Sequence, residues 1–173
     1  MKVLSAFRSK VAVSIENVSP NSMNERQTIL LVDDSTEDIF LMRTAFEKAE
    51  FNSQLQEVHS GEEAIAYLKG EGAYGDRNKH PLPSVMLLDL NMPMKNGFDV
   101  LSWVRSQPEF KRLSITILTA SMRPEDVERA FDLGANSYLV KPSNLDALAS
   151  MIRCLRDWIQ INHFPPLNEA VTR

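Results

Sequence analysis

The nine residues from Val85 to Pro93, with the sequence VMLLDLNMP, constrain the fold more than any other stretch. Four apolar residues lead directly into Asp89, and Pro93 interrupts regular structure four residues later. An apolar run this short, bounded by turn-forming residues, predicts a strand buried on both faces of a parallel sheet. Ligands of open parallel α/β sheets bind beyond the carboxyl ends of the strands, so we expect Asp89 at such an end. A single Asp is more often a turn or helix-cap residue, and only the other strand ends decide between these interpretations.

Four further apolar runs predict strands, and amphipathic segments between them predict helices. The other strands are expected at residues 28–32, 55–58, 115–118 and 137–140. The helices are expected at residues 36–50, 61–69, 98–104, 124–134 and 144–161. Five strands alternating with five helices predict a doubly wound parallel sheet covered on both faces. Right-handed crossovers restrict the winding, and the flavodoxin-like strand order 2-1-3-4-5 is the common solution at this size.

Local patterns predict how the helices begin and which side chains they bury. Three helices are preceded by a Ser with an acid three residues later, the pattern of a capping box. These pairs are Ser35 with Asp38, Ser60 with Glu63, and Ser143 with Asp146. Apolar residues three and four apart are expected to face the core. They are Ile39, Met42, Phe46 and Ala49; Ala64, Ile65 and Leu68; Phe98, Leu101 and Val104; and Leu145, Leu148, Ile152, Leu155 and Ile159.

Two stretches do not follow this pattern. Residues 70–83 contain three glycines and two prolines and predict a loop longer than the usual connection of about 4 to 6 residues. Residues 1–26 begin with a basic, acid-free segment whose apolar run is too short for a secretory signal. We interpret them as a disordered leader or as an over-extended start with Met23 as the initiator, with a mitochondrial-type presequence as a further alternative. The ordered domain is then expected at residues 27–162, followed by a tail at residues 163–173.

Composition excludes several classes of protein. The net charge of -4 argues against a nucleic-acid or anionic-membrane surface. Cys154 is the single cysteine of the 173 residues, which excludes an internal disulfide and fits the cytosol. No apolar run approaches the roughly 20 residues that span a bilayer. The three histidines show no metal-ligand spacing.

Polar residues follow the other strands just as Asp89 follows its own. Asp33 and Asp34 follow the first strand, Thr119 ends the fourth, and Lys141 follows the fifth. In the 2-1-3-4-5 order the first and third strands are neighbours at the switch point of the sheet, so these side chains should converge in one crevice.

This convergence has a chemical rationale. Clustered carboxylates with oxygen-only partners suit Mg²⁺, and a hydroxyl and an ammonium group suit the oxygens of a phosphoryl group. A carboxylate can itself be the nucleophile of phosphoryl transfer and form an aspartyl phosphate. Three capping Asp residues and one surface Lys would be the structural alternative, but it requires a coincidence at four strand ends.

Residues 28–161 therefore resemble the receiver domain of two-component response regulators. The matching residues are Asp33-Asp34, Asp89, Thr119 and Lys141-Pro142, and Asp-Leu-Asn-Met-Pro running on to Asn96-Gly97 is also similar to the family. Thirty residues separate Asp89 from Thr119, and 22 separate Thr119 from Lys141, as in the family.

The resemblance implies a role for each matching residue. Asp89 would accept a phosphoryl group from the phosphohistidine of a sensor histidine kinase. Asp34 and Asp89 would bind Mg²⁺ directly, Asp33 largely through water, and the backbone carbonyl of Asn91 would complete the set. Lys141 would pair with Asp89 and then with the phosphoryl oxygens, and its bond to Pro142 would be cis.

Two further roles are implied for the response to phosphorylation. Thr119 would turn its hydroxyl to the phosphoryl group, and Tyr138 would follow by turning inward; an ordinary strand aromatic is the alternative for Tyr138. A receiver of this kind catalyses only its own phosphorylation and dephosphorylation. A degenerate receiver that works without phosphorylation, as an interaction module, is the alternative function.

The chain also departs from the chemotaxis-type receivers. About a dozen residues follow the last helix, too few to fold an output domain. Together with the long loop at residues 70–83, this resembles the stand-alone regulators paired with bacteriophytochrome histidine kinases. A kinase of that type is therefore the expected partner.

The last helix carries a second apolar stripe beside its core stripe. It comprises Ala147, Met151, Cys154, Trp158 and Ile161. A surface helix needs only one apolar face, so the stripe predicts a protein interface, most simply a homodimer. Deeper burial of the helix, or coverage by the C-terminal tail, would be the alternative.

Two rival functions fail on particular residues. A phosphatase of the haloacid-dehalogenase type needs a second acid two residues after the nucleophile, where this chain has Asn91. A flavodoxin-like cofactor binder needs a phosphate-binding loop after the first strand, where Asp33 and Asp34 would repel phosphate.

Overall fold

The computed structural model describes residues 27–165 and 167. The strands are β1 (Thr28–Val32), β2 (Gln54–Val58), β3 (Val85–Leu88), β4 (Ser114–Thr119) and β5 (Ser137–Val140). The helices are α2 (Thr36–Lys48), α3 (Gly61–Lys69), α4 (Gly97–Ser106), α5 (Pro124–Asp132) and α6 (Leu145–Ile161). A single 3₁₀ turn in this part of the chain, η2, covers Gly72–Tyr74. The prediction for residues 1–26 and most of that for the tail lie outside the described residues.

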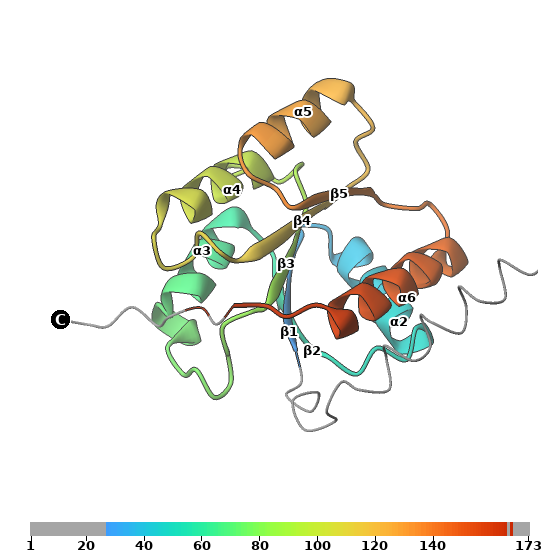
Figure 1. Cartoon of the computed structure of the whole chain (residues 1–173), viewed down its shortest axis with the longest axis horizontal. Helices are drawn as coiled ribbons and strands as arrows, with labels where there is room; N and C mark the ends of the chain where they lie inside the picture. The colour runs from blue at the N-terminus through green and yellow to red at the C-terminus, as the bar shows by residue number, and fades with distance from the viewer. Residues whose placement is uncertain (1–26, 166, 168–173) are drawn as a thin grey trace, which may run out of the picture.

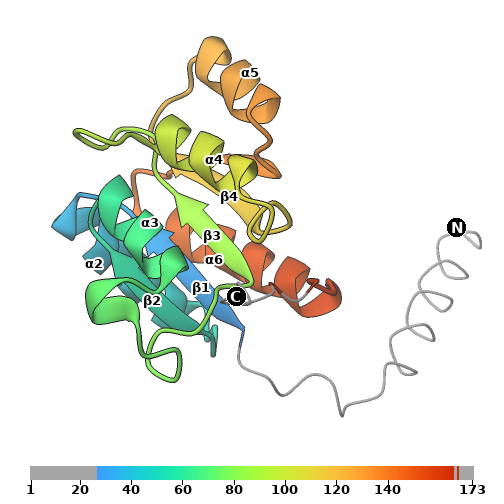
Figure 2. The same ribbon diagram turned by 90° about the vertical axis from the view of Figure 1, so that its left-hand side faces the viewer.

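The five strands form one parallel sheet with the order β2-β1-β3-β4-β5. This is the predicted flavodoxin-like α/β fold. The side chains of the central strands β1, β3 and β4 are buried throughout, because helices cover both faces. Helices α3 and α4 lie on one face and α2 and α6 on the other (Figures 1 and 2).

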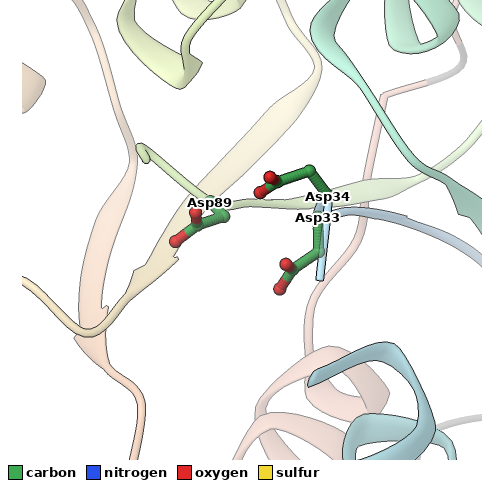
Figure 3. Close-up of side chains that lie close together, drawn as sticks. All are labelled: Asp33, Asp34 and Asp89. Atoms are coloured by element: carbon green, nitrogen blue, oxygen red, sulfur yellow. The ribbon is translucent and has the colours of Figure 1, made fainter. Parts of the chain in front are cut away.

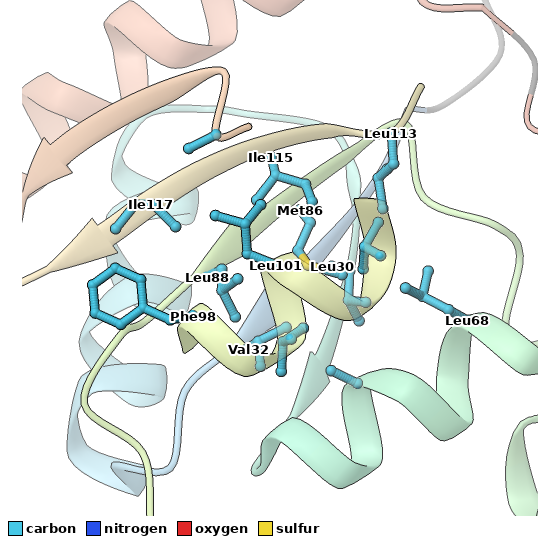
Figure 4. Close-up of a cluster of buried hydrophobic side chains, with 14 of the residues drawn as sticks. Leu30, Val32, Leu68, Met86, Leu88, Phe98, Leu101, Leu113, Ile115 and Ile117 are labelled. Atoms are coloured by element: carbon cyan, nitrogen blue, oxygen red, sulfur yellow. The ribbon is translucent and has the colours of Figure 1, made fainter. Parts of the chain in front are cut away.

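The alternation of side chains along each strand divides the core into two clusters. Leu30, Met86 and Ile115 point to the face covered by α3 and α4 (Figure 4). Ile29, Leu87 and Leu118 point to the opposite face, where Met42 of α2 and Ile152 of α6 meet them. Because each face is buried, a shift of one residue in strand register would exchange the two clusters, which specifies the register strongly.

Most of the predicted inward-facing residues are buried. Ser35 and Ser60 cap α2 and α3 as predicted, although neither paired acid accepts from the backbone N–H of its cap residue. All predicted core positions of α2 and α4 are buried. On α3, however, Tyr67 is buried and Ile65 only half-buried, and on α6 Leu145 is half-buried. The predicted cap at Ser143 is wrong, because Asn144 caps α6 by accepting a hydrogen bond from the Ala147 N–H at 2.8 Å. Ser and Asn are equally good N-caps, so the sequence did not distinguish the two neighbours.

The segment 70–83 is folded onto the amino end of the sheet around Arg77. Its guanidinium donates to the carbonyl oxygens of Tyr67 (2.8 Å), Leu68 (2.6 Å) and His80 (3.2 Å). The first two lie in the last turn of α3, where the Tyr67 carbonyl also accepts from the Gly70 N–H at 3.1 Å, so Arg77 completes the C-terminal cap of this helix. The Tyr67 hydroxyl, whose pKa is raised by burial, donates to the Pro81 carbonyl at 2.7 Å. The predicted loop is thus an ordered structure with internal hydrogen bonds.

The chain after α6 packs back against the domain. The Phe164 ring lies 5.7 Å from the Trp158 ring in an edge-on arrangement and packs on the cluster beside α2 and α6. Leu167 packs on the other cluster, beside α3 and α4. The segment that follows α6 therefore contacts both sides of the sheet. No helix among the described residues is long and apolar enough to cross a membrane.

Candidate functional site

The carboxyl ends of β1 and β3 bring the three predicted aspartates together. Val32 and Leu88 are register partners on these neighbouring strands, so the residues that follow them lie side by side. Asp33, Asp34 and Asp89 each offer a carboxylate oxygen within 4.8 Å of the others (Figure 3). Asp33 is only 1% and Asp89 only 6% exposed, whereas Asp34 is open to solvent. Two of the three carboxylates are therefore shielded from solvent in the crevice, and the third faces its mouth.

The connection from β3 to α4 holds Asp89 in place. The backbone N–H of Asn91 donates to Asp89 Oδ2 at 2.9 Å. The N–H of Gly97, the first residue of α4, donates to the Leu90 carbonyl at 3.1 Å. A Cβ at position 97 would lie only 2.2 Å from the Asp89 carbonyl oxygen, so only glycine fits there. Gly97, noted in the sequence for its resemblance alone, thus has a steric role in positioning Asp89.

Thr119 and Tyr138 lie on the next two strands. Thr119 is fully buried, and its Oγ1 accepts a hydrogen bond from Asn91 Nδ2 at 3.3 Å. The half-buried Tyr138 donates its hydroxyl to the Ser121 carbonyl at 3.1 Å, and burial raises the pKa of the phenol. Ser121 in turn contacts Thr119 Oγ1 through its backbone N–H at 3.4 Å. A chain of contacts therefore connects Asp89 with Tyr138 through Asn91, Thr119 and Ser121.

Lys141 reaches the crevice from the end of β5, but its closest partner is not Asp89. Its Nζ lies 2.6 Å from Asp33 Oδ2, 2.8 Å from Asp38 Oδ2 and 3.5 Å from Asp89 Oδ1. Asp38 was predicted only as a capping residue, and its contact with Lys141 was missed. The sequence showed an additional acid in the first turn of α2, but neighbouring residues alone do not indicate the direction of its side chain.

The predicted cis bond between Lys141 and Pro142 is wrong, because the described residues contain no cis peptide bond. An X–Pro bond favours trans by about 0.5 to 1 kcal/mol, so the tertiary context decides the isomer. The Lys141 N–H donates to the Thr119 carbonyl at 2.8 Å, and this bond holds the backbone at the strand end.

The crevice carries an excess of negative charge. Burial raises the pKa of Asp33, the contact with Lys141 opposes this, and the net direction is upward. For Lys141 burial alone would lower the pKa, but hydrogen bonds to Asp33 and Asp38 outweigh burial and raise it. Lys141 is therefore a cation at neutral pH. One ammonium group cannot balance Asp33, Asp34, Asp38 and Asp89, so a further cation is favoured.

The arrangement of oxygen atoms suits such a cation. The three carboxylate oxygens that approach within 4.8 Å of one another are hard ligands, and exposure of Asp34 leaves room for water in the remaining positions. This donor set fits Mg²⁺, which is held by one or a few carboxylates and keeps several waters. Asp33, Asp34 and Asp89 are the residues that would hold it.

The predicted interface stripe lies on the outer side of α6. Met151 is half-buried and Cys154 is exposed, while Trp158 is 40% and Ile161 76% exposed. Met151, Cys154 and Trp158 line a groove of about 300 Å³ between α6 and β5. Phe164 covers part of Trp158, so coverage by the tail, the predicted alternative, holds for part of the stripe. Most of the stripe is open in the isolated chain.

The five-stranded parallel sheet carries an acidic triad at its switch point, with the buried Thr119 and the half-buried Lys141 beside it. The model of the response regulator receiver domain matches residues 29–153. The chain belongs to the response regulator receiver family.

Its relatives include regulators that are associated with phytochromes. The response regulator Rcp1 of Synechocystis is 33% identical over 143 residues, which cover 82% of this chain and 95% of Rcp1. A structure of Mn²⁺-bound Rcp1 matches with a TM-score of 0.71 over 81% of this chain and 99% of that one.

Two further solved structures extend this likeness. The phosphorylated cyanobacterial phytochrome response regulator RcpA is 32% identical, with a TM-score of 0.75 over 82% of this chain and all of RcpA. The regulator RPA3017 of red light signalling in R. palustris is 30% identical, with a TM-score of 0.77 over 81% of this chain and 99% of that one. The chain thus resembles this stand-alone, phytochrome-associated group over nearly the full length of its members.

Proposed function

We propose that the protein is a stand-alone response regulator of a cytosolic phosphorelay, which accepts a phosphoryl group on Asp89 from a sensor histidine kinase in the presence of Mg²⁺. The observation that carries this proposal is the meeting of Asp33, Asp34 and Asp89 within 4.8 Å, with the Lys141 ammonium 3.5 Å from Asp89. Phosphorylation then changes the surfaces that other proteins contact.

The transfer step requires little of the protein beyond positioning and charge. A carboxylate oxygen of Asp89 attacks phosphorus, and the O–P bond forms as the N–P bond of the kinase phosphohistidine breaks. The imidazole keeps the electron pair of that bond, and Asp89 becomes a 4-aspartylphosphate. Asn91 orients Asp89 through the 2.9 Å hydrogen bond to Oδ2, which leaves Oδ1 to attack.

Charge in the crevice supports the same step. Lys141 places a positive charge beside the oxygen that becomes part of the phosphoryl group. Bound Mg²⁺ would neutralise the carboxylates and the transferred oxygens. Asp33, Asp34 and Asp89 hold it in the proposal, together with the backbone carbonyl of Asn91.

The response is proposed to pass through Thr119 and Tyr138. In the present state Thr119 Oγ1 is engaged by Asn91 and the Ser121 N–H, and Tyr138 by the Ser121 carbonyl. A phosphoryl oxygen on Asp89 would accept a hydrogen bond from the Thr119 hydroxyl, draw this side chain toward Asp89 and disturb the Ser121 segment. Ser121 Oγ donates a hydrogen bond to Asp126 Oδ2 of α5 at 2.5 Å, so a movement of Ser121 would also affect α5.

The proposed partner is a histidine kinase of the phytochrome class, as the name of the phytochrome response regulator RcpA suggests. Large apolar side chains are exposed in the segments that follow β1, β3 and β4. Phe40 is 64%, Met94 85% and Met122 77% exposed. Exposed apolar side chains around a site mark contact with another protein. They would pack against the kinase while its phosphohistidine reaches Asp89.

Labelling with acetyl phosphate tests the proposal. Wild type should gain one phosphoryl group in Mg²⁺ and none in excess chelator, as measured by intact-mass spectrometry. Asp89→Asn should lose at least about 100-fold in labelling rate, because it removes the nucleophile. Asp132→Asn, an exposed acid at the end of α5, is the matched control and should label normally. Equal labelling of Asp89→Asn and wild type contradicts the assignment, and an unlabelled wild type favours the phosphorylation-independent receiver.

The stripe on α6 supports the further proposal of a homodimer. Met151 and Trp158 lie two turns apart, and their groove with β5 offers apolar area to a second copy. A buried interfacial Trp often contributes about 2 kcal/mol or more. Sedimentation equilibrium should show a wild-type dimer, and Trp158→Ala with Met151→Ala should be monomeric but still labelled at Asp89. Gln160→Ala on the same helix is the control. A wild type that is monomeric with and without phosphate at tens of micromolar contradicts the dimer.

A further inference from the structure

The ammonium group of Lys141 is held on the α2 side of the crevice. It donates to Asp33 Oδ2 at 2.6 Å and to Asp38 Oδ2 at 2.8 Å, whereas the distance to Asp89 Oδ1 is 3.5 Å. The two short hydrogen bonds therefore compete with the contact to Asp89. Asp33 has a second role in the proposed metal site, but the proposed transfer gives no role to Asp38.

The first turn of α2 directs the Asp38 carboxylate toward Lys141. As the third helical residue, Asp38 would ordinarily close a capping box by accepting from the backbone N–H of Ser35. That N–H instead donates to Asp33 Oδ1 at 3.0 Å. The other half of the cap is intact, because the Asp38 N–H donates to Ser35 Oγ at 3.1 Å. Asp38 is thus fixed by its backbone, while its carboxylate is available for Lys141.

Helix α4 shows the usual arrangement. There the N-cap Asn96 and the third helical residue Asp99 close both halves of the capping box, with hydrogen bonds of 3.1 and 3.2 Å. The contrast shows that an acid at this position of α2 is diverted from its ordinary capping role. Asp38 also lies outside the group of carboxylates whose oxygens approach within 4.8 Å, so holding a metal ion does not explain the diversion.

Exposure indicates which partner Lys141 gives up most easily. The side chain of Asp38 is 40% exposed, whereas that of Asp33 is 2% exposed. Water can replace Lys141 at Asp38 at little cost, but a buried carboxylate left unpaired is expensive. A phosphoryl group on Asp89 brings more negative charge than a carboxylate and should draw Lys141 from Asp38 first.

We propose that Asp38 is a positioning residue that holds Lys141 away from Asp89 in the unphosphorylated protein and releases it when a phosphoryl group binds. This inference rests on the proposed function, because it assumes that Lys141 serves the phosphoryl group. Asp38 then opposes phosphoryl binding, since each binding event must first break the hydrogen bond from Lys141. The strength of that bond sets how readily the crevice changes to its phosphorylated arrangement.

Beryllofluoride, a stable mimic of the phosphoryl group, provides the test. Its dissociation constant is measured by ¹⁹F NMR at saturating Mg²⁺ for wild type, Asp38→Asn and Glu37→Gln. Glu37→Gln removes the same charge one residue away, from an exposed side chain without a contact to Lys141. Asp38→Asn should bind beryllofluoride about threefold or more tightly than wild type, the value of a partly exposed charged hydrogen bond. Glu37→Gln should bind it as wild type does.

Two additional measurements separate positioning from a general effect of charge. In the Lys141→Met background, Asp38→Asn should no longer change the affinity for beryllofluoride, because the residue acts through Lys141. The affinity for Mg²⁺ alone should be the same in Asp38→Asn and Glu37→Gln. Asp38→Glu retains the carboxylate and should restore the wild-type affinity for beryllofluoride.

Each result has a defined meaning. The role of Asp38 is overturned if Asp38→Asn and Glu37→Gln bind beryllofluoride equally well. It is also overturned if Asp38→Asn still changes the affinity in the Lys141→Met background. Both outcomes leave the proposed function standing. A wild-type protein that binds no beryllofluoride in Mg²⁺ contradicts the proposed function itself. Asp38→Ser is measured in parallel, so that a folding defect specific to Asn does not decide the outcome.

Discussion

The two ends of the sheet differ in what their charged and polar side chains contact. At the amino end, Arg77 and the Tyr67 hydroxyl donate to neutral backbone carbonyls, and each bond closes the segment 70–83 onto the domain. At the carboxyl end, Asp33, Asp34 and Asp89 meet around a single Lys141. The amino end is held by hydrogen bonds to neutral carbonyl groups, whereas the carboxyl end carries an excess of negative charge. Stability and chemistry are therefore separated along the strands, and the charged end depends on the remainder of the domain to hold it together.

Arg77→Ala should have the largest effect on stability and none on the crevice. The substitution leaves the Leu68 and His80 carbonyl oxygens without this donor and removes one of the two donors to Tyr67, so it should lower the free energy of unfolding by about 2 to 3 kcal/mol. Urea denaturation measures this loss, and acetyl phosphate labelling should stay within about twofold of wild type at a temperature where the variant is folded. Lys79→Ala, in the same segment but exposed, is the control. A large loss of labelling in folded Arg77→Ala would show that the two ends are coupled.

Asp33→Asn should change the free energy of unfolding in the opposite direction. It removes one charge from the crowded crevice while keeping the shape of the side chain, so without Mg²⁺ the free energy of unfolding should rise by about 1 kcal/mol. Mg²⁺ should raise the melting temperature of wild type more than that of Asp33→Asn, because Asp33 belongs to the proposed metal site. Asp132→Asn should behave as wild type in both measurements. A less stable Asp33→Asn would mean that the bond to Lys141 outweighs the repulsion.

The raised pKa of Asp33 predicts that the stability of the protein depends on pH. Burial raises the pKa of Asp33 in the folded protein above the ordinary value of 3.8. At a pH between the pKa of Asp33 in the unfolded state and its raised pKa in the folded state, the folded state binds more protons than the unfolded state. The contribution of Asp33 to stability therefore falls as the pH rises above about 3.8. Urea denaturation across this range in chelator should show the decline in wild type and a smaller one in Asp33→Asn. Identical pH profiles would contradict the upward direction.

Thr119→Ala should have a small effect on stability, about 1 kcal/mol, because it removes a buried methyl group and weak hydrogen bonds of 3.3 and 3.4 Å. Labelling at Asp89 should persist, while the change that phosphorylation causes in hydrogen exchange of α5 should be lost. Thr119→Ser retains the hydroxyl and is the matched control. An identical exchange response in wild type and Thr119→Ala would show that the crevice signals by another route.

Much of this organisation was already determined by the sequence. The run at Val85–Leu88 and the four other strands predicted the sheet, because short apolar runs between amphipathic helices have few alternative folds. Once the strand order was predicted, the acids that follow β1 and β3 had to meet, since neighbouring parallel strands end at the same edge. The crevice residues Asp33, Asp34, Asp89, Thr119 and Lys141 could therefore be located from the sequence.

The partners of several polar side chains were decided only by the tertiary structure. Asp38 looked like a capping residue and contacts Lys141, and Arg77 looked like a loop residue and caps α3. Ser143 looked like the N-cap of α6, but Asn144 has that role. Apolar periodicity depends on residues that are close in the chain, so it can be recognised in the sequence alone. A charged side chain instead chooses among several acceptors separated by small free energies, and residues distant in the chain determine which acceptor is within reach.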